Sequence, residues 1–349
     1  MREITITDRE EGQRLDRFLQ KYMPVAPKSF FYKMLRKKNI VLNGKKATGT
    51  ERIRKDDVVK MFLAEDTIEK FRGTAEKKHF AAPDGNHFSE SLDIVYEDSH
   101  VLVVNKPMGV LSQKSDKDDV SLVEMIEDYL SEEGDSDTFR PGICNRLDRN
   151  TTGLVVAGKS IRSLQAMNRL FQERKVRKYY LCIVHGVLKD EQRLEGYLSK
   201  DEDSNTVSVS VERTDKYKLT EQSGSKGKSG NKEPVKIVTA YKPLQWGHYQ
   251  GEEFTLLRVH LITGKSHQIR AHLASIGHPL VGDAKYSTKY FAEFDRKQFG
   301  QSWQLLHAWE LHLPEESTLF SSDMVWQADL PEHFIKILIQ LEMKLPEGE

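Results

Sequence analysis

The amino-acid sequence predicts an α+β protein in which a small α+β domain precedes a larger one. Two observations lead to this prediction. Residues 1–63 read as two short helices followed by two strands, and the chain beyond them mixes β-rich runs with amphipathic helices. At 349 residues the chain is long enough for two domains.

The N-terminal helices are predicted from apolar spacing. Leu15, Phe18 and Leu19 share one helix face at i, i+3 and i+4, and Pro24 breaks this helix. A second helix is predicted over 29–38. Its polar side carries the basic residues Lys33, Arg36, Lys37 and Lys38.

The strands of the small domain are predicted from a turn signal. A strand at 40–42 runs into Asn43-Gly44, which is a strong hairpin signal, and a second strand is predicted at 56–59. Residues 64–90 lack periodicity and contain Gly and Pro, so we expect an inter-domain linker there.

The larger domain is expected over residues 91–340. It opens with two short β-rich runs between residues 92 and 104. Amphipathic helices are predicted at 122–130 and at 160–173. The apolar face of the second helix consists of Leu164, Met167, Leu170 and Phe171.

Composition argues against a membrane-spanning protein, a secreted protein and a disulfide-rich protein. The hydrophobic fraction is 38% and the charged fraction 30%, and no apolar run reaches the length of a membrane span. The charged N-terminus lacks an apolar signal core, so we expect a cytoplasmic location. Two cysteines, Cys144 and Cys182, are too few for a disulfide framework or a cysteine zinc site, and we expect both to be reduced in a core.

The net charge of zero hides an asymmetry along the chain. Residues 1–63 contain 16 Lys or Arg and 8 Asp or Glu, so this segment carries +8 and the remainder −8. A basic module joined to an acidic one suggests that one part docks on phosphate while the other performs chemistry. Lysines that only aid solubility are the alternative reading.

One segment combines charges in an unusual way. In Arg146-Leu147-Asp148-Arg149, a carboxylate stands between two arginines, ahead of a Thr-Thr-Gly turn and an apolar strand. Such an Asp is expected to stay ionised at neutral pH, and a loop before a buried strand holds it rigidly. A salt-bridged structural Asp would have the same local sequence.

Two further polar segments stand at predicted strand ends. Residues 177–184 begin a strand with Tyr179 and Tyr180. Residues 257–274 read as strand, turn and helix, and they are followed by Gly-His-Pro-Leu-Val-Gly-Asp at 277–283. Segments so far apart in the chain converge only through folding, which is how many active sites are built.

These segments resemble the RluA-type family of large-subunit rRNA pseudouridine synthases. The family signatures are His-Arg-Leu-Asp-Arg-x-Thr-Ser-Gly-Leu, Lys-x-Tyr and Gly-Arg-Thr-His-Gln-Ile-Arg, and the resemblance covers residues 92–315. This chain differs at Asn145 (for His), Thr152 (for Ser) and Lys265-Ser266 (for Arg-Thr). Asn145 puts an RNA contact of the usual His in doubt. The first 63 residues resemble the S-four-type RNA-binding domain, which many members carry.

The resemblance implies a fold and a reaction. The catalytic domain would have the pseudouridine synthase fold, an α+β domain with a curved, mostly antiparallel sheet. The enzyme would isomerise uridine within RNA without a cofactor or a metal. Asp148 would be the catalytic carboxylate, and Arg270 would pair with it. Tyr180 would stack on the target base and is the candidate general base, with Tyr179 on the opposite face of its strand.

The resemblance also implies RNA contacts. Arg146 would fill the space of a flipped-out nucleotide, because guanidinium groups stack well on bases. Arg149 and Lys106 would contact phosphate, together with Lys33, Arg36 and Lys37 of the N-terminal domain. A structural ion pair for Arg146, and solvated positions for the lysines, are the alternatives. The expected partner is large-subunit rRNA rather than tRNA, and a monomer is expected.

Three questions stay open at the level of sequence. Asp148 would either attack the ribose or assist loss of a ribose proton to give a glycal. A non-catalytic RNA-binding or ribosome-assembly factor would keep the fold without needing Asp148, Tyr180 and Arg270 together. A metal-dependent RNA hydrolase is a third reading, but one isolated Asp is a poor metal site.

Overall fold

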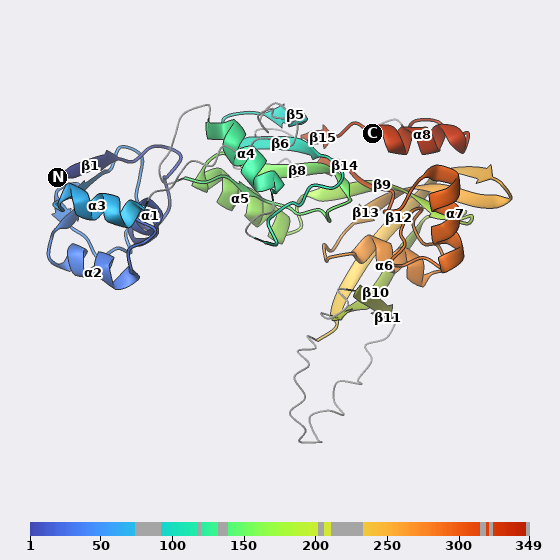
Figure 1. Cartoon of the computed structure of the whole chain (residues 1–349), viewed down its shortest axis with the longest axis horizontal. Coiled ribbons are helices and arrows are strands. Elements are labelled where there is room, and N and C mark those ends of the chain that lie inside the picture. The colour runs from blue at the N-terminus through green and yellow to red at the C-terminus, as the bar shows by residue number, and fades with distance from the viewer. Residues whose placement is uncertain are drawn as a thin grey trace, which may run out of the picture. The chain divides into compact units, whose positions relative to one another are not determined.

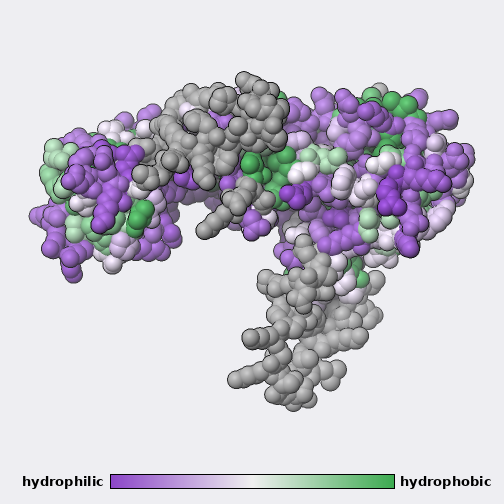
Figure 2. Space-filling model, in the orientation of Figure 1, coloured by the Kyte–Doolittle hydropathy of each residue, from purple (hydrophilic) through white to green (hydrophobic). Residues whose placement is uncertain are grey.

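The computed structural model describes residues 1–73, 92–116, 120–131, 139–201, 206–210, 233–314, 319–320 and 324–346. The chain forms two compact units. The first contains residues 1–104, 112–146 and 155–172, and the second contains residues 105–111, 147–154 and 173–349. Hydrophilic residues cover most of the described surface that is visible in Figure 2, as the high charged fraction predicts.

The N-terminal part of the first unit contains the predicted helices and hairpin, which are blue in Figure 1. Helix α1 spans Leu15–Tyr22 and α2 spans Lys28–Arg36. Asn43 and Gly44 both have positive φ, as the tight turn between β2 and β3 requires. The four-stranded sheet has the order β1-β4-β2-β3, formed by Arg2–Thr5, Val58–Met61, Ile40–Leu42 and Lys45–Lys46.

The expected linker is wrong in its first part. Glu65–Arg72 forms helix α3, and Ile68 is buried in the same apolar cluster as Phe18 and Phe31. Acidic residues in its first turn and basic residues in its last turn oppose the helix dipole, which favours a helix despite weak apolar periodicity. The rest of the predicted linker, from residue 74, lies outside the described residues.

The remainder of the first unit consists of two helices and the strands at one end of an 11-stranded sheet. Helices α4 (Leu122–Ser131) and α5 (Ile161–Gln172) confirm the two amphipathic helices predicted in this region. The strand order is β8-β6-β5, with β7 paired to β8. These strands span Thr152–Gly158, Val101–Lys106, Ile94–Glu97 and Gly142–Ile143. The first residues of β8 and the last residues of β6 belong to the second unit.

The second unit is built on a mostly antiparallel sheet, as predicted. Its hydrogen-bonded order is β11-β10-β12-β13-β9-β14, with β15 antiparallel to β14 and the start of β8 parallel to β14. The bounds are β9 Arg177–His185, β10 Gln192–Asp201, β11 Thr206–Ser210, β12 Val235–Tyr249, β13 Glu252–Leu261, β14 Leu306–His312 and β15 Val325–Gln327.

Helices cover both faces of this sheet (Figure 1). The strand register shows which residues lie on each face. Helix α8 (Glu332–Gln340) packs with Leu181 and Ile183 on one face, close to residues of α7 (Lys289–Phe299). On the other face, α6 (Gln268–Ser275) packs on β10 and β12. Because neighbouring strand residues alternate, Tyr180 faces the α6 side, opposite Val259.

The two cysteines are free thiols in different surroundings. Cys182 is fully buried in β9, as expected, whereas Cys144 is partly exposed to solvent. Burial raises the pKa of both thiols, that of Cys144 to about 12, so neither is poised as a thiolate nucleophile. No helix in the described ranges is both long and apolar enough to cross a membrane.

Candidate active site

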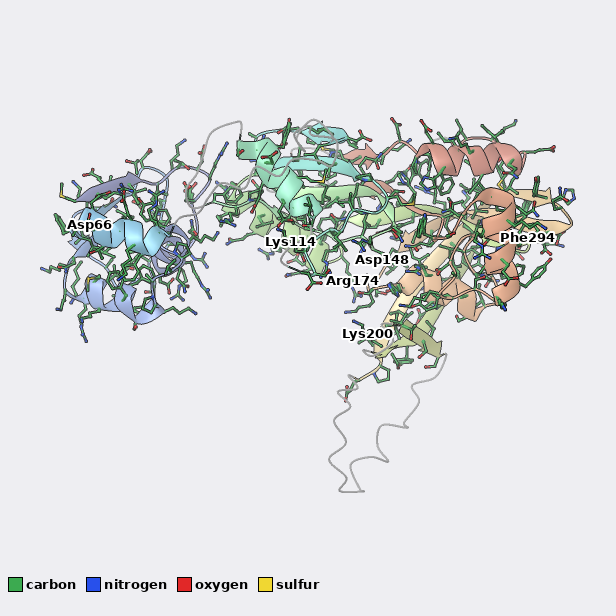
Figure 3. All side chains as sticks on the ribbon, viewed as in Figure 1. Asp66, Lys114, Asp148, Arg174, Lys200 and Phe294 are labelled. Atoms are coloured by element: carbon green, nitrogen blue, oxygen red, sulfur yellow. The ribbon has the colours of Figure 1, made fainter. Side chains whose placement is uncertain are left out.

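Asp148 lies in the loop before β8 (labelled in Figure 3), and backbone hydrogen bonds hold this loop. The Asp148 carbonyl accepts a bond from the Thr151 N–H at 3.1 Å, and the Arg149 carbonyl accepts one from the Gly109 N–H at 3.1 Å. The Asp148 side chain is 27% exposed, so its carboxylate is partly screened yet accessible. The loop therefore presents a carboxylate on a fixed backbone.

Lys106 supports this loop from within. Its side chain is fully buried, and its Nζ donates to the carbonyls of Pro107, Val110 and Arg149 at 2.9 Å each. Burial lowers the pKa of Lys106 to about 7, and Asp148 acts in the opposite direction. The three carbonyl acceptors match the three protons of the ammonium form and also oppose the shift. This position does not fit the predicted phosphate contact.

Arg270 reaches Asp148 from α6 as predicted, but its principal partner is a different carboxylate. Its Nη1 donates to Asp148 Oδ2 at 3.3 Å. Its Nε and Nη2 donate to the two oxygens of Asp283 at 2.6 and 2.8 Å, which is a bidentate pair. Burial acts to lower the pKa of Arg270, but the bonds to Asp283 outweigh it and the pKa is raised. The guanidinium is thus held charged between two acids.

Gln268 explains why α6 places Arg270 there. Its side-chain nitrogen donates to the Val238 carbonyl and to Thr239 Oγ1, both at 3.0 Å. Its side-chain oxygen accepts bonds from Thr263 Oγ1 at 2.9 Å and from the Lys265 N–H at 3.2 Å. A fully satisfied buried amide fixes the first turn of α6 to β12. Arg270, two residues later, is then directed toward Asp148.

His267 also faces the carboxylate, although no catalytic role was predicted for it. Its Nε2 lies 3.8 Å from Asp148 Oδ2, and its Nδ1 is hydrogen-bonded to the Tyr286 hydroxyl at 2.7 Å. Burial lowers the pKa of His267, so the ring is neutral at physiological pH. It precedes α6 with a left-handed backbone, φ 57°.

Tyr180 lies on the same face of the sheet as α6 and is buried, with 6% exposure. Burial, followed by the negative charge of Asp148, raises the pKa of the Tyr180 hydroxyl. That direction opposes the phenolate form and does not fit the general-base role predicted for this residue. Tyr179 lies on the opposite face, against His260 and under the Arg258 guanidinium at 3.9 Å, as strand alternation predicts.

The remaining predicted RNA contacts are on the surface. Arg146 and Arg149 are exposed at either side of Asp148 in the chain, and Arg149 Nε donates to the Gly109 carbonyl at 3.2 Å. Lys33, Arg36 and Lys37 are exposed at the C-terminal end of α2. These positions are compatible with contacts to a polyanion.

Asn145, which replaces a family His, has a structural contact. Its side-chain oxygen accepts a hydrogen bond from the Val156 N–H in β8 at 2.9 Å. The amide therefore ties the segment before Asp148 to the strand that follows it. An amide suffices for this bond, so the replacement is compatible with the loop geometry.

Sequence reasoning missed two members of the cluster, Asp283 and Tyr286. Asp283 stood in a segment that was singled out, but nothing in the sequence indicated which acid would meet Arg270. A buried arginine needs a buried counter-charge, and that requirement was the available signal. Tyr286 carried no signal, because its role depends on contacts with β11 and α6.

Residues 100–275 match the RNA pseudouridylate synthase family. The chain belongs to this family, and the protein is an isomerase that acts on RNA.

The relatives extend over most of the chain. An uncharacterized RNA pseudouridine synthase from Aquifex aeolicus is 30% identical over 285 residues, which are 80% of this chain and 78% of that protein. Ribosomal large subunit pseudouridine synthase D from Nitrosomonas europaea is 27% identical and covers 99% of this chain and 89% of its own. Synthase C from Haemophilus ducreyi is 27% identical, covering 97% of this chain and 95% of its own.

A solved structure supports the fold. Human RNA pseudouridylate synthase domain containing 4 superposes with a TM-score of 0.57 at 22% identity, and it covers 74% of this chain and 97% of its own. At this identity the likeness shows the fold alone.

Proposed function

We propose that this enzyme converts specific uridines of large-subunit ribosomal RNA to pseudouridine, with Asp148 as the catalytic carboxylate. The observation that carries the proposal is the contact between Asp148 and Arg270, whose guanidinium is itself fixed by Asp283. A binding protein does not need a buried arginine aimed at a partly exposed carboxylate.

The reaction conserves electrons and needs only local proton movements. The bond from ribose C1′ to base N1 breaks, a bond from C1′ to C5 forms, C5 loses its proton and N1 gains one. Asp148 acts on the ribose, either by attack or by assisting loss of a ribose proton. Both routes use a carboxylate group that the hydrogen bond from Arg270 orients. Tyr180, on the same face, supplies an aromatic surface for the base.

RNA recognition is assigned to two regions. We assign Arg146 to the space left by the flipped nucleotide, since unstacking a base costs a few kcal/mol that a stacked guanidinium helps to offset. Arg149 contacts phosphate beside it. The N-terminal region acts as an RNA-binding domain through Lys33, Arg36 and Lys37, and its attachment raises the local RNA concentration at the catalytic domain.

The substrate class rests on the relatives. Two of them are named as large-subunit ribosomal synthases, and they cover at least 97% of this chain, including the basic N-terminal region. We therefore propose a role in rRNA processing during ribosome biogenesis. A cytoplasmic location and a monomeric state are part of the same proposal. Transfer RNA is the alternative substrate.

The test is a map of pseudouridine across total RNA from cells that lack this protein, complemented with the native chain, Asp148→Asn or Asp148→Ala. We expect specific large-subunit rRNA positions to lose the modification and only the native chain to restore it. Restoration by either variant would refute the role of Asp148. Loss confined to tRNA would refute the rRNA assignment and leave the reaction intact.

A further inference from the structure

Tyr286 connects the two side chains that stand beside Asp148. Its hydroxyl is 2.7 Å from His267 Nδ1, and its ring lies 5.1 Å from the Arg270 guanidinium carbon. The ring also packs against the apolar cluster of β10, β11, β12 and α6. Tyr286 lies beyond residues 100–275, which the family match covers.

The hydrogen bonds of the Tyr286 hydroxyl are best satisfied by one form of His267. The oxygen accepts a bond from the Val207 N–H at 3.0 Å. A hydroxyl has one proton to donate, and the arrangement that uses it is donation to His267 Nδ1. A neutral imidazole that accepts at Nδ1 carries its proton on Nε2, so an N–H group faces Asp148.

That N–H group and the Arg270 guanidinium both point toward the same oxygen of Asp148. His267 Nε2 is 3.8 Å from Asp148 Oδ2, and Arg270 Nη1 is 3.3 Å from it. The His267 distance is too long for a hydrogen bond in this state, but a shift of about 1 Å would make one. After such a shift, two donors on one oxygen would fix the rotation of the carboxylate about its side-chain bond.

The backbone of His267 is also unusual. Its φ of 57° is a left-handed conformation that a non-glycine residue seldom adopts and that carries an energetic cost. The bond to Tyr286 compensates for part of that cost and keeps the ring directed at Asp148. Strained residues that are held by their surroundings are often functional.

We propose that Tyr286 is a positioning residue whose hydroxyl holds His267 as the Nε2–H tautomer toward Asp148 and whose ring supports Arg270. This inference rests on the proposed role of Asp148. Through Val207 it links β11 to the orientation of the catalytic carboxylate.

The proposal predicts a pH dependence with a definite sign. The charged groups around His267 are Asp148, Arg270, Asp283 and Lys285. Without the Tyr286 hydroxyl, the neutral ring is free to place its proton on Nδ1 and turn a lone pair toward Asp148. Below the pKa of His267 the imidazolium carries both protons, so an N–H faces Asp148 again.

The first experiment compares Tyr286→Phe with the native enzyme and with Tyr290→Phe, in which an exposed tyrosine loses its bond to Glu252. The assay follows tritium released from C5 of labelled uridine in large-subunit rRNA purified from cells that lack the enzyme. We expect Tyr286→Phe to lower kcat about tenfold near pH 8, with KM for RNA changed by less than about twofold. The defect should shrink as the pH falls through the pKa of His267, and Tyr290→Phe should behave like the native enzyme.

Two further measurements separate a positioning role from a structural one. In a His267→Asn background, adding Tyr286→Phe should change kcat less than about twofold, since it acts through His267. Nitrogen-15 NMR of labelled histidine should find the Nε2–H tautomer of His267 in the native enzyme and its loss in Tyr286→Phe. A defect equal at every pH, additive effects, or an Nδ1–H tautomer in the native enzyme would overturn the proposal. The NMR result does not depend on turnover. A failure of the proposed catalytic role of Asp148 would therefore be recognised separately from a failure of the role of Tyr286.

Discussion

At the scale of single residues, Arg270 is held by Asp283 more firmly than it holds Asp148. The bidentate contacts are 2.6 and 2.8 Å, against 3.3 Å to Asp148. Both Arg270 and Asp283 are buried, so each is the counter-charge that the other requires. Asp148 can therefore change its contacts during the reaction without releasing the arginine.

Replacing Asp283 by Asn should consequently damage both stability and activity. The change leaves the Arg270 charge without its buried partner, which is expected to lower the free energy of unfolding by about 3 kcal/mol. Urea unfolding measures this, with Asp190→Asn, at an exposed position, as the matched control. A loss of activity with unchanged stability would mean that Asp283 has a role other than holding Arg270.

Lys106 should behave as a structural residue and not as an RNA contact. Lys106→Met removes the donor to three backbone carbonyls. Each hydrogen bond contributes about 1 kcal/mol, so unfolding should become easier by roughly 3 kcal/mol. The exposed Lys242→Met is the control. Unchanged thermal unfolding together with weaker RNA binding would restore the phosphate-contact interpretation.

At the scale of elements, the start of β8 approaches β14 so closely that only glycine fits. A Cβ on Gly153 would lie 2.6 Å from the Ala308 nitrogen and closer still to its carbonyl oxygen, and φ is +110°. The parallel pairing of these strands positions the end of the Asp148 loop. The glycine of the Thr-Thr-Gly turn is therefore required because no larger residue fits against β14.

Gly153→Ala should therefore be far more damaging than a glycine substitution in open space. Gly251→Ala in the β12–β13 hairpin is a matched control, because its φ is +85° and no atom lies within 4 Å of the added Cβ. We expect the control to cost about 1 kcal/mol and Gly153→Ala at least about 3 kcal/mol. Equal effects in chemical unfolding would show that β8 can move away from β14.

At the scale of the whole molecule, two buried neutral histidines should make stability depend on pH. Burial lowers the pKa of His272 and of His307 from 6.5 to about 4. As the pH falls below about 6.5 the unfolded chain binds protons that the folded chain does not, so stability is lost down to about pH 4, by roughly 3 kcal/mol for each histidine. His307→Gln should flatten the profile of unfolding free energy against pH, whereas the exposed His248→Gln should not.

The basic N-terminal region should supply much of the RNA affinity of the full-length protein. Combining Lys33→Ala, Arg36→Ala and Lys37→Ala removes three charges, so the slope of log affinity against log salt should fall by about 2, with kcat little changed. Filter binding at several salt concentrations measures this. Lys289→Ala, which removes a cation that is 90% exposed on α7, is the control. An unchanged slope would place the RNA contacts elsewhere.

The sequence was enough to predict the family, the mixed α+β class, most helices and the carboxylate–arginine pair, because local spacing and short motifs carry that information. It misjudged α3, whose end charges stabilise a helix that apolar periodicity alone does not predict. The three-dimensional structure was needed to show that Lys106 is buried, that Asp283 holds Arg270, and that Tyr286 joins His267 to β11. Each of these depends on which partners meet across distant segments, and a hydrogen bond or a buried charge is defined by its partner.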